Sequence, residues 1–284
     1  MTTSVSKAVL ITGCSTGIGR ATALRLAKNG HTVYATARRR ESIADLTPQG
    51  CQTLALDVCD EASMQAAVTA VESAHGAVGV LINNAGYGSE GPLEEIPMSE
   101  MRRQFDTNVF GLTRLTQLVL PGMRRQRWGK IVNLSSMGGR LTLPGGGIYH
   151  ATKYAVEALS DALRFEVRGF GVDVIVVEPG AIKTAFGDTA IARVEALQGS
   201  ADYAAFREVL KQQIRSAYEG PMSALAVGPE AVAKVIEKAI TASRPRSRYV
   251  VTFGAKFLIR LRRWLPDRAF DAFLRTQFPS PGAA

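Results

Sequence analysis

The stretch that decides the fold, residues 8–19, reads A-V-L-I-T-G-C-S-T-G-I-G. Its first five residues are a short apolar run rich in β-branched side chains, which is typical of a buried strand. Three glycines follow with the spacing G-x-x-x-G-x-G, and a helical pattern then extends to Asn29 and Gly30. A strand, a glycine turn and a helix in this order predict a dinucleotide site, because glycine lets the backbone approach a pyrophosphate and the helix N-terminus faces it. The alternative is a tight turn that needs glycine only for its own geometry.

Apolar runs alternate with helical patterns along the rest of the chain. The expected strands cover residues 32–37, 80–82, 131–134, 172–177 and 248–251, and another strand ends with residues 54–58. The expected helices cover 62–74, 101–125, 149–168 and 230–242. Strands that alternate with helices pair in parallel through right-handed crossovers. The pattern therefore predicts an α/β fold with a doubly wound parallel sheet and helices on both faces.

Length and composition are those of a single domain over residues 1–284. The chain is 46% hydrophobic and 21% charged, which argues against disorder. No apolar run reaches the ~20 residues that a bilayer span needs, and residues 1–7 are too polar for a signal peptide. Cys14, Cys51 and Cys59 form no C-x-x-C pair, so we expect reduced thiols and a cytoplasmic location.

A second motif, Y-H-A-T-K at residues 149–153, opens one of the expected helices. Residues four apart lie on one face of a helix, so the phenol of Tyr149 and the ammonium of Lys153 lie side by side. A free tyrosine titrates near ~10, and a neighbouring cation lowers that pKa by stabilising the phenolate. Such a tyrosine can exchange a proton with a substrate oxygen. Ser136 stands 13 residues before Tyr149, at the mouth of the preceding expected strand.

These motifs, together with N-N-A-G at residues 83–86, occur in the order and spacing of one known family. The chain resembles the short-chain dehydrogenase/reductase family over about residues 5–253. The resemblance implies a Rossmann-type sheet with the strand order 3-2-1-4-5-6-7. It also implies that Tyr149 donates the proton, that Ser136 hydrogen-bonds the substrate oxygen, and that Lys153 lowers the tyrosine pKa and holds the nicotinamide ribose.

Asn108 lies inside the expected helix 101–125, in F-D-T-N-V-F-G. Asparagine is a poor residue inside a helix, because its side chain competes for backbone hydrogen bonds. The resemblance makes Asn108 the fourth catalytic residue, on a kinked helix, where it holds a water that relays the proton outward. A polar residue placed there by chance is the alternative.

The cofactor contacts follow from the same motifs. They are Gly13, Ser15, Thr16, Gly17, Ile18, Gly19, Arg38, Asp57, Val58, Asn84, Ala85, Gly86, Tyr149, Lys153, Pro179, Gly180, Ile182 and Thr184. Asp57 fits a turn or an N-cap as well as it fits an adenine contact. No metal site is predicted, since the three histidines, His31, His75 and His150, lack ligand spacing and are expected to be surface or packing residues.

Arg38 favours NADP(H) over NAD(H). It follows the expected strand 32–37, where an NAD-selective site has an acidic residue that holds the ribose 2′-hydroxyl, and here that residue is Ala37. A guanidinium binds a 2′-phosphate through charge-assisted, bidentate hydrogen bonds. A solvated charge run with Arg39 and Arg40 is the alternative.

Residues 186–222 are helical in pattern and lie where the family has its substrate lid. The run from Glu178 to Phe186 resembles the steroid and retinol dehydrogenase branch. The apolar lid residues are Phe186, Ile191, Val194, Leu197, Tyr203, Phe206, Val209 and Leu210. They predict a bulky, lipophilic alcohol or ketone as the substrate, unless they pack only against their own scaffold.

Residues 253–278 form an expected helical extension that mixes apolar residues with arginines. Between Arg244 and Arg275, nine Lys and Arg stand against two Asp, a charge of +7 out of +9 for the chain. This extension covers the substrate pocket or makes a weak contact with an anionic membrane surface. We favour the cover, because Pro266 interrupts the segment and the arginines are not confined to one face.

The leading hypothesis is an NADP(H)-dependent alcohol dehydrogenase or carbonyl reductase for a small lipophilic molecule. The alternative is a non-catalytic NADP(H)-binding sensor or scaffold, against which the presence of Ser136, Tyr149 and Lys153 argues. The pI near 9.7 makes nucleic-acid binding a candidate function. No module that reads nucleic-acid sequence is recognisable, so no nucleic-acid partner is expected. The resemblance also implies a homodimer or homotetramer packed through the helices that contain Asn108 and Tyr149.

Overall fold

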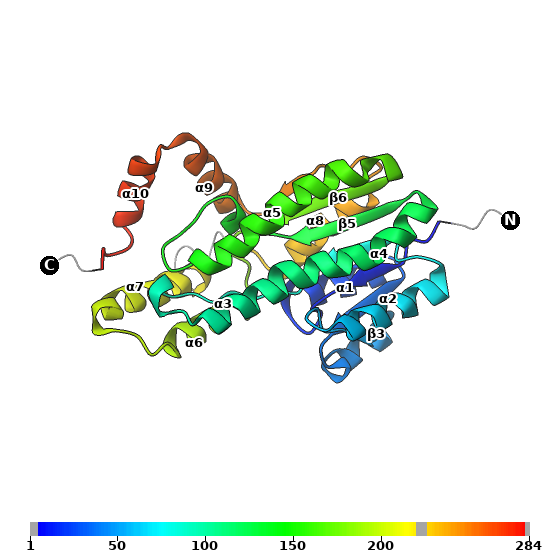
Figure 1. Ribbon diagram of the computed structural model, residues 1–284, viewed down its shortest axis with the longest axis horizontal. Helices are drawn as coiled ribbons and strands as arrows, with labels where there is room; N and C mark the ends of the chain where they lie inside the picture. The colour runs from blue at the N-terminus through cyan, green and yellow to red at the C-terminus, as the bar shows by residue number, and fades with distance from the viewer. Residues whose placement is uncertain (1–4, 220–225, 282–284) are drawn as a thin grey trace.

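A computed structural model describes residues 5–219 and 226–281 of the chain. A seven-stranded parallel sheet forms its centre, with the order β3-β2-β1-β4-β5-β6-β7 (Figure 1). The strands are β1 (Val9–Ile11), β2 (Val33–Ala37), β3 (Cys51–Ala55), β4 (Val80–Asn83), β5 (Gly129–Leu134), β6 (Val172–Glu178) and β7 (Arg248–Val250). The predicted Rossmann-type fold and strand order are confirmed.

Helices cover both faces of the sheet. One face carries α1 (Gly17–Lys28) and α8 (Pro229–Thr241), and the other carries α2 (Glu61–His75), α4 (Leu112–Gln126) and α5 (Gly147–Val167). In β1, Ile11 packs into the core that contains Leu26 of α1, whereas Leu10 packs into the core that contains Leu115 of α4. Successive strand side chains point to opposite faces, so a sheet covered on both faces needs apolar residues throughout.

The carboxyl ends of the strands meet at one edge of the sheet. The glycine turn follows β1, Asn84 follows β4, Ser136 comes two residues after β5, and Pro179 follows β6. Ligands of open α/β sheets bind outside this edge. The fold therefore gathers candidate residues that are far apart in the sequence.

The expected helix 101–125 lies within a continuous helical stretch, residues 98–126, and the irregularity expected at Asn108 is a π-helical turn. The stretch is divided into α3 (Met98–Phe105), a π-helical turn (Asp106–Gly111) and α4. The π turn contains Asn108, whose side chain bonds to other parts of the fold. Single π turns inside α-helices occur frequently at functional sites.

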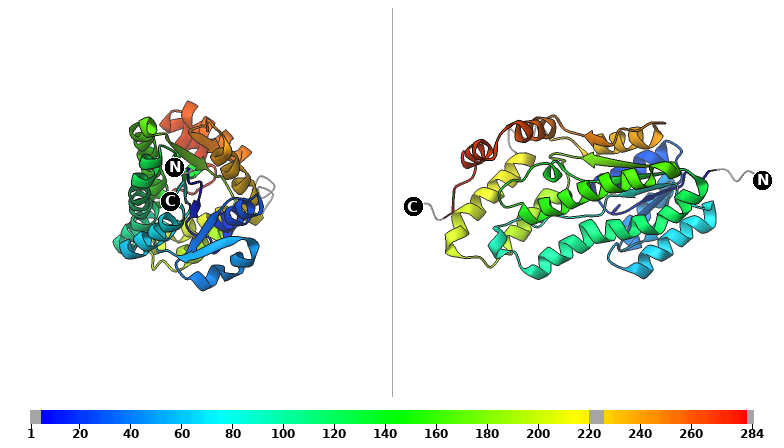
Figure 2. Two further views of the ribbon diagram at one scale, coloured as in Figure 1. Left: turned by 90° about the vertical axis from the view of Figure 1, so that its right-hand side faces the viewer. Right: turned by 45° about the horizontal axis from the view of Figure 1, so that its top comes forward.

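Four helices lie at the end of the molecule opposite the N-terminus (Figures 1 and 2). They are α6 (Phe186–Glu195), α7 (Ala204–Glu219), α9 (Phe253–Trp264) and α10 (Asp267–Arg275). Residues 220–222 of the expected lid lie outside the described residues. Pro266 separates α9 from α10, as its position in the sequence indicates. Within residues 5–219 and 226–281, no helix combines the length and apolar character needed to cross a membrane.

Candidate active site

The glycine turn has the geometry of an anion-binding site. Gly13 and Gly17 adopt φ values of 73° and 59°, which only glycine reaches without strain. A side chain at Gly19 would clash with the Asn84 amide and with the Gly13 carbonyl. Thr16 makes no side-chain capping bond to α1, whose first turn has no acidic residue. The N–H groups that open α1 are therefore free for a phosphate.

Asn84 and Ala85 join the glycine turn to the end of β4. The Asn84 amide donates to the carbonyls of Thr12 (2.9 Å) and Gly13 (3.0 Å). The Thr12 hydroxyl accepts from the backbone N–H groups of Asn84 (3.0 Å) and Ala85 (2.9 Å). These bonds fix the turn before any ligand arrives, so N-N-A-G has a structural role.

Arg38 is exposed directly after β2, near the glycine turn. Its side chain has no hydrogen bond or ion pair with any described residue, whereas nearby Arg20 pairs with Asp45 and Arg40 bonds to the Thr53 hydroxyl. A guanidinium that needs no protein partner is available to a phosphate. The residues at this edge thus fit a nicotinamide dinucleotide.

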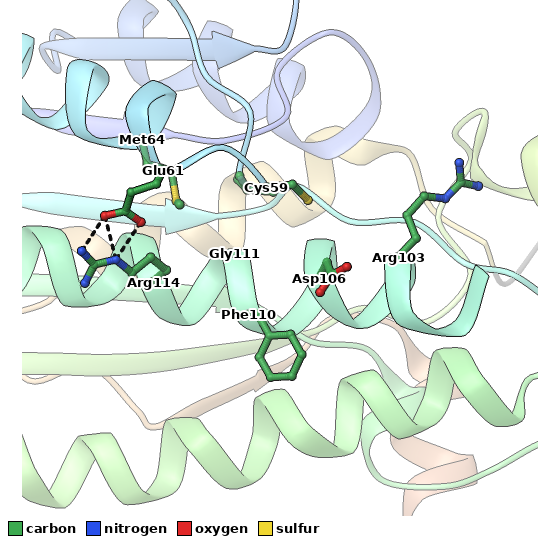
Figure 3. A pocket seen from close by; sticks show the side chains of 9 residues that line it. Cys59, Glu61, Met64, Arg103, Asp106, Phe110, Gly111 and Arg114 are labelled. Atoms are coloured by element: carbon green, nitrogen blue, oxygen red, sulfur yellow. Dashed lines mark hydrogen bonds and ion pairs between the residues drawn. The ribbon is translucent and has the colours of Figure 1, made fainter. Parts of the chain in front are cut away.

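The turn after β3 holds Asp57 and Val58. The Asp57 carboxylate accepts from the Cys59 backbone N–H at 2.9 Å, so the turn role considered for Asp57 is present in the structure. A cavity of about 330 Å³ opens between this turn and the α3–α4 region (Figure 3). Val58 and Cys59 line it, and a Glu61–Arg114 ion pair closes one side. None of Ser136, Tyr149 and Lys153 lines it, so it is not the catalytic pocket.

The side chain of Asn108 ties the π turn to two other segments. Its carbonyl accepts from the Tyr87 N–H at 3.1 Å, and its amide donates to the Tyr87 carbonyl (2.8 Å) and to the Thr152 hydroxyl (3.1 Å). Thr152 in turn donates to the Tyr149 carbonyl at 2.7 Å. Thr152, one residue before Lys153, is a positioning residue that the motifs alone did not indicate.

Lys153 is buried at the edge of the sheet where the strands have their carboxyl ends. Its ammonium donates to the Leu134 carbonyl at 2.8 Å, and burial lowers its pKa to about 8. A Cβ atom at Gly86 would lie 3.0 Å from the Asn108 amide oxygen and 3.8 Å from the Lys153 nitrogen. Because position 86 has no side chain, the Asn108 amide and the Lys153 ammonium can both lie close to the Gly86 backbone.

The Tyr149 ring lies near this lysine and near Phe186 of α6. The Lys153 nitrogen is 5.7 Å from the centre of the Tyr149 ring, and the centre of the Phe186 ring in α6 is 5.4 Å from the same point. A side chain at Gly88 would meet both aromatic rings, so glycine there leaves space beside them. Ser136 begins the turn after β5, and its hydroxyl accepts from the Gly138 N–H at 3.0 Å. The phenol, the hydroxyl and the ammonium thus come to the same edge of the sheet.

The segment after β6 lies against the glycine turn. A Cβ atom at Gly17 would be 3.3 Å from the Thr184 methyl group, and Ile182 is buried. The Pro179 carbonyl accepts from the Met137 N–H at 2.9 Å, which links this segment to the turn of Ser136. Gly180 is packed against Thr252, where a side chain would clash.

A buried charge network lies behind Lys153, and no local sequence pattern indicates it. Arg248 of β7 bonds to Glu157 at 2.9 Å and lies 3.3 Å from Glu178, which also pairs with Arg140 at 3.1 Å. Burial, together with the charge of Glu157, raises the pKa of Glu178. Glu157 is one helical turn after Lys153, and its charge opposes the effect of burial on the lysine pKa.

The loop after β4 connects the site to the lid. Arg193 of α6 lies over the Tyr87 ring at 4.2 Å and pairs with Glu100 of α3, which also accepts from Ser89. Glu90, next along the loop, is half-buried, and none of the hydrogen bonds or ion pairs among the described residues involves its carboxyl group. Burial raises the Glu90 pKa to about 7.

Comparison with known proteins identifies the family. The short chain dehydrogenase family model matches residues 7–194. The chain belongs to the short-chain dehydrogenase family. It is 37% identical to a 3-ketodihydrosphingosine reductase from Bacteroides thetaiotaomicron, over 94% of this chain and 96% of that protein. It is 35% identical to human 17-beta-hydroxysteroid dehydrogenase type 1, over 91% of this chain and 81% of that protein.

Solved structures of short-chain dehydrogenases have the same fold. One from Streptomyces avermitilis has a TM-score of 0.79 at 32% identity and covers 95% of both chains. A serine dehydrogenase complexed with NADP+ has a TM-score of 0.75 at 26% identity, covering 86% of this chain and 94% of that one. A short-chain dehydrogenase from Burkholderia phymatum in complex with NAD has a TM-score of 0.77 at 26% identity and covers both chains fully. Structural neighbours of this chain therefore bind nicotinamide dinucleotides of both kinds.

Proposed function

We propose that this oxidoreductase transfers a hydride between NADP(H) and a secondary alcohol or ketone that is bulky and lipophilic. The observation that carries the proposal is the convergence of Tyr149, Lys153 and Asn108 at the edge where the glycine turn opens. A buried ammonium beneath a phenol is the arrangement that a proton-donating tyrosine needs. A sensor or scaffold has no need for it.

Each polar group has a role in the proposed reaction. The bound nicotinamide supplies or accepts the hydride. Tyr149 protonates the oxygen of the substrate during reduction, and Ser136 hydrogen-bonds the same oxygen. Lys153 stabilises the phenolate of Tyr149 and binds the nicotinamide ribose. Asn108, fixed by Tyr87 and Thr152, keeps the π turn in place and holds the water that relays the proton.

The proposed preference for NADP(H) rests on Arg38. The guanidinium is exposed and has no partner in the described parts of the chain, and a 2′-phosphate supplies one. A relative from Ornithobacterium rhinotracheale, 34% identical over 92% of this chain and 94% of that protein, is an NADPH-dependent 3-dehydrocapnine reductase. Since the Burkholderia phymatum neighbour binds NAD, the fold alone does not select the cofactor.

Fewer of the apolar residues between Phe186 and Leu210 are available to a lipophilic substrate than the sequence suggests. Val194, Phe206, Val209 and Leu210 pack with Phe278 in a small core of their own, which is the scaffold alternative. The Phe186 ring, in contrast, lies beside the Tyr149 ring, tilted by 56° with the centroids 5.4 Å apart. The relatives named for a ketodihydrosphingosine and a hydroxysteroid support the same substrate class.

The proposed homodimer or homotetramer uses α4, α5 and the π turn between α3 and α4. Phe110 in the π turn and Tyr154, Leu159 and Phe165 on α5 are all exposed large hydrophobic side chains. Exposed apolar side chains gathered on neighbouring helices indicate an association surface. Light scattering of a cytoplasmically expressed sample distinguishes an oligomer from the 30.4 kDa monomer.

A substrate series tests the proposal. NADPH consumption is measured with ketones of increasing apolar area, up to the size of a steroid, and kcat/KM is expected to rise with that area. A series without a rise contradicts the lipophilic pocket but leaves the reaction class intact. NADPH binding without turnover of any carbonyl compound favours the sensor.

A further inference from the structure

We propose that the outer face of α9 binds a bilayer surface that carries anionic lipid headgroups. Three aromatic side chains form this face, with Phe253 74%, Phe257 55% and Trp264 81% exposed. They stand at positions i, i+4 and i+11 of the helix, within an arc of about 40°. We call them the aromatic stripe. Nothing in the described chain packs over the stripe, although large aromatic side chains such as these are usually buried in a core or an interface.

A basic row borders the aromatic stripe. Lys256, Arg260 and Arg263 are exposed on one side of it, and α9 contains no acidic residue. Arg262 turns the other way, bonding to Asp267 and lying 5.1 Å from the Phe270 ring. The arginines of α9 are thus not confined to one face, as expected, but its exposed basic side chains, Lys256, Arg260 and Arg263, share one side.

The inner side of α9 is the side that covers the protein. Ala255 is buried, and α9 packs against the turn Met137–Gly139 that follows Ser136. Arg262 and α10 line a cleft of about 410 Å³ with the loop at residues 142–147. The inner side of α9 can thus act as the expected cover of the pocket, while the outer side is the one proposed to contact the membrane.

A lipid surface fits the outer side better than a protein partner does. The stripe lies along a single helix for about 17 Å, and α9 lies at the edge of the molecule (Figures 1 and 2). Phe and Trp side chains enter the boundary between headgroups and acyl chains when a helix lies in the membrane plane, while Lys and Arg reach the headgroup phosphates. A basic row with no acidic counterpart is complementary to anionic lipids.

Vesicle co-sedimentation tests the inference on the full-length protein. The chain is mixed with vesicles of phosphatidylglycerol and phosphatidylcholine, and in parallel with pure phosphatidylcholine vesicles. Binding to the mixed vesicles is expected, weakening with added salt. Each basic side chain near the surface contributes about fivefold in partitioning. The triple variant K256Q/R260Q/R263Q should therefore bind about 100-fold more weakly.

Matched variants distinguish binding through the outer face of α9 from a general effect of the positive charge of the protein. K28Q/R39Q/R102Q removes three exposed basic residues elsewhere and should bind as the wild type does. Phe257→Ser with Trp264→Ser should lose binding, whereas Phe165→Ser, at an exposed aromatic of α5, should retain it. Thermal unfolding of every variant checks that it is folded, since all these side chains are exposed.

Tryptophan emission supplies an independent readout. Trp264 is exposed and Trp128 is half-buried against the core, so insertion of the stripe should shift the emission to shorter wavelengths. Trp264→Phe should keep binding and abolish the shift. The inference is overturned if the wild type ignores anionic vesicles, or if both charge triples weaken binding equally. It is also overturned if light scattering shows that the stripe joins two copies of the chain instead.

Discussion

Thr152→Val tests whether the contact to Asn108 positions the catalytic helix. The substitution keeps the shape of the side chain but removes the hydroxyl that accepts from the Asn108 amide at 3.1 Å and donates to the Tyr149 carbonyl at 2.7 Å. Thr152 is fully buried, so no water replaces the lost acceptor. An unsatisfied buried N–H costs about 1–3 kcal/mol, and we expect the free energy of unfolding to fall by that amount.

The same variant should slow the reaction without weakening cofactor binding. Asn108 keeps its two bonds to Tyr87 but loses its link to α5, so the π turn and Tyr149 are no longer held in register. A displacement of the catalytic groups by a fraction of an ångström lowers kcat on the order of tenfold. Steady-state kinetics with NADPH and a ketone measure kcat, and fluorescence titration measures the NADPH Kd, which should stay unchanged.

Thr113→Val is the matched control, because among residues 5–219 and 226–281 the Thr113 hydroxyl bonds only to the Val109 carbonyl of its own helical segment. It should leave kcat close to the wild-type value and change the free energy of unfolding by less than Thr152→Val does. If Thr152→Val has the same kcat as Thr113→Val, the Asn108–Thr152 contact does not position the site.

Two further predictions concern the cofactor and the buried lysine. Arg38→Asp should weaken NADPH binding roughly ten- to a hundredfold, the loss expected for a charge-assisted pair, and favour NADH; a wild-type protein that uses NADH as readily as NADPH would contradict the role of Arg38. Lys153→Met should raise the free energy of unfolding of the cofactor-free protein at pH 7. Because burial lowers the folded pKa of Lys153 to about 8, below its ordinary value, charging the lysine opposes folding below pH 8. The penalty shrinks between pH 8 and the unfolded pKa, so denaturant unfolding at pH 7 and pH 9.5 should show a smaller gain at the higher pH. A variant that is less stable than the wild type at pH 7 contradicts this.

The sheet could be predicted from the sequence because each strand and turn is indicated by residues that are adjacent in the chain. Each buried strand is a short apolar run, and the turn after β1 needs glycine at Gly13 and Gly17, where φ is positive. Parallel pairing and right-handed crossovers then leave few ways to arrange the strands. The convergence of Ser136, Tyr149 and Lys153 follows from the same rule, since all three come at or after the carboxyl end of β5.

The features that were not predictable depend on contacts between distant residues. The resemblance implied a kinked helix at Asn108, but nothing in 101–125 alone specifies a π turn, which depends on the bonds from Asn108 to Tyr87 and Thr152, 21 and 44 positions away. The ion pair of Arg248 with Glu157 spans 91 positions. The aromatic stripe depends on Phe253–Trp264 forming one helix that ends before Pro266, because only helical spacing brings its three aromatic side chains to one face.

The most direct test of the central claim is Tyr149→Phe. The substitution removes only the hydroxyl, so the ring contacts with Phe186 and Lys153 remain. Turnover of a ketone by NADPH is measured alongside NADPH binding by fluorescence. The proposed chemistry predicts that turnover is almost abolished while NADPH binds as it does to the wild type. Substantial residual turnover would contradict the assignment of Tyr149 as the proton donor.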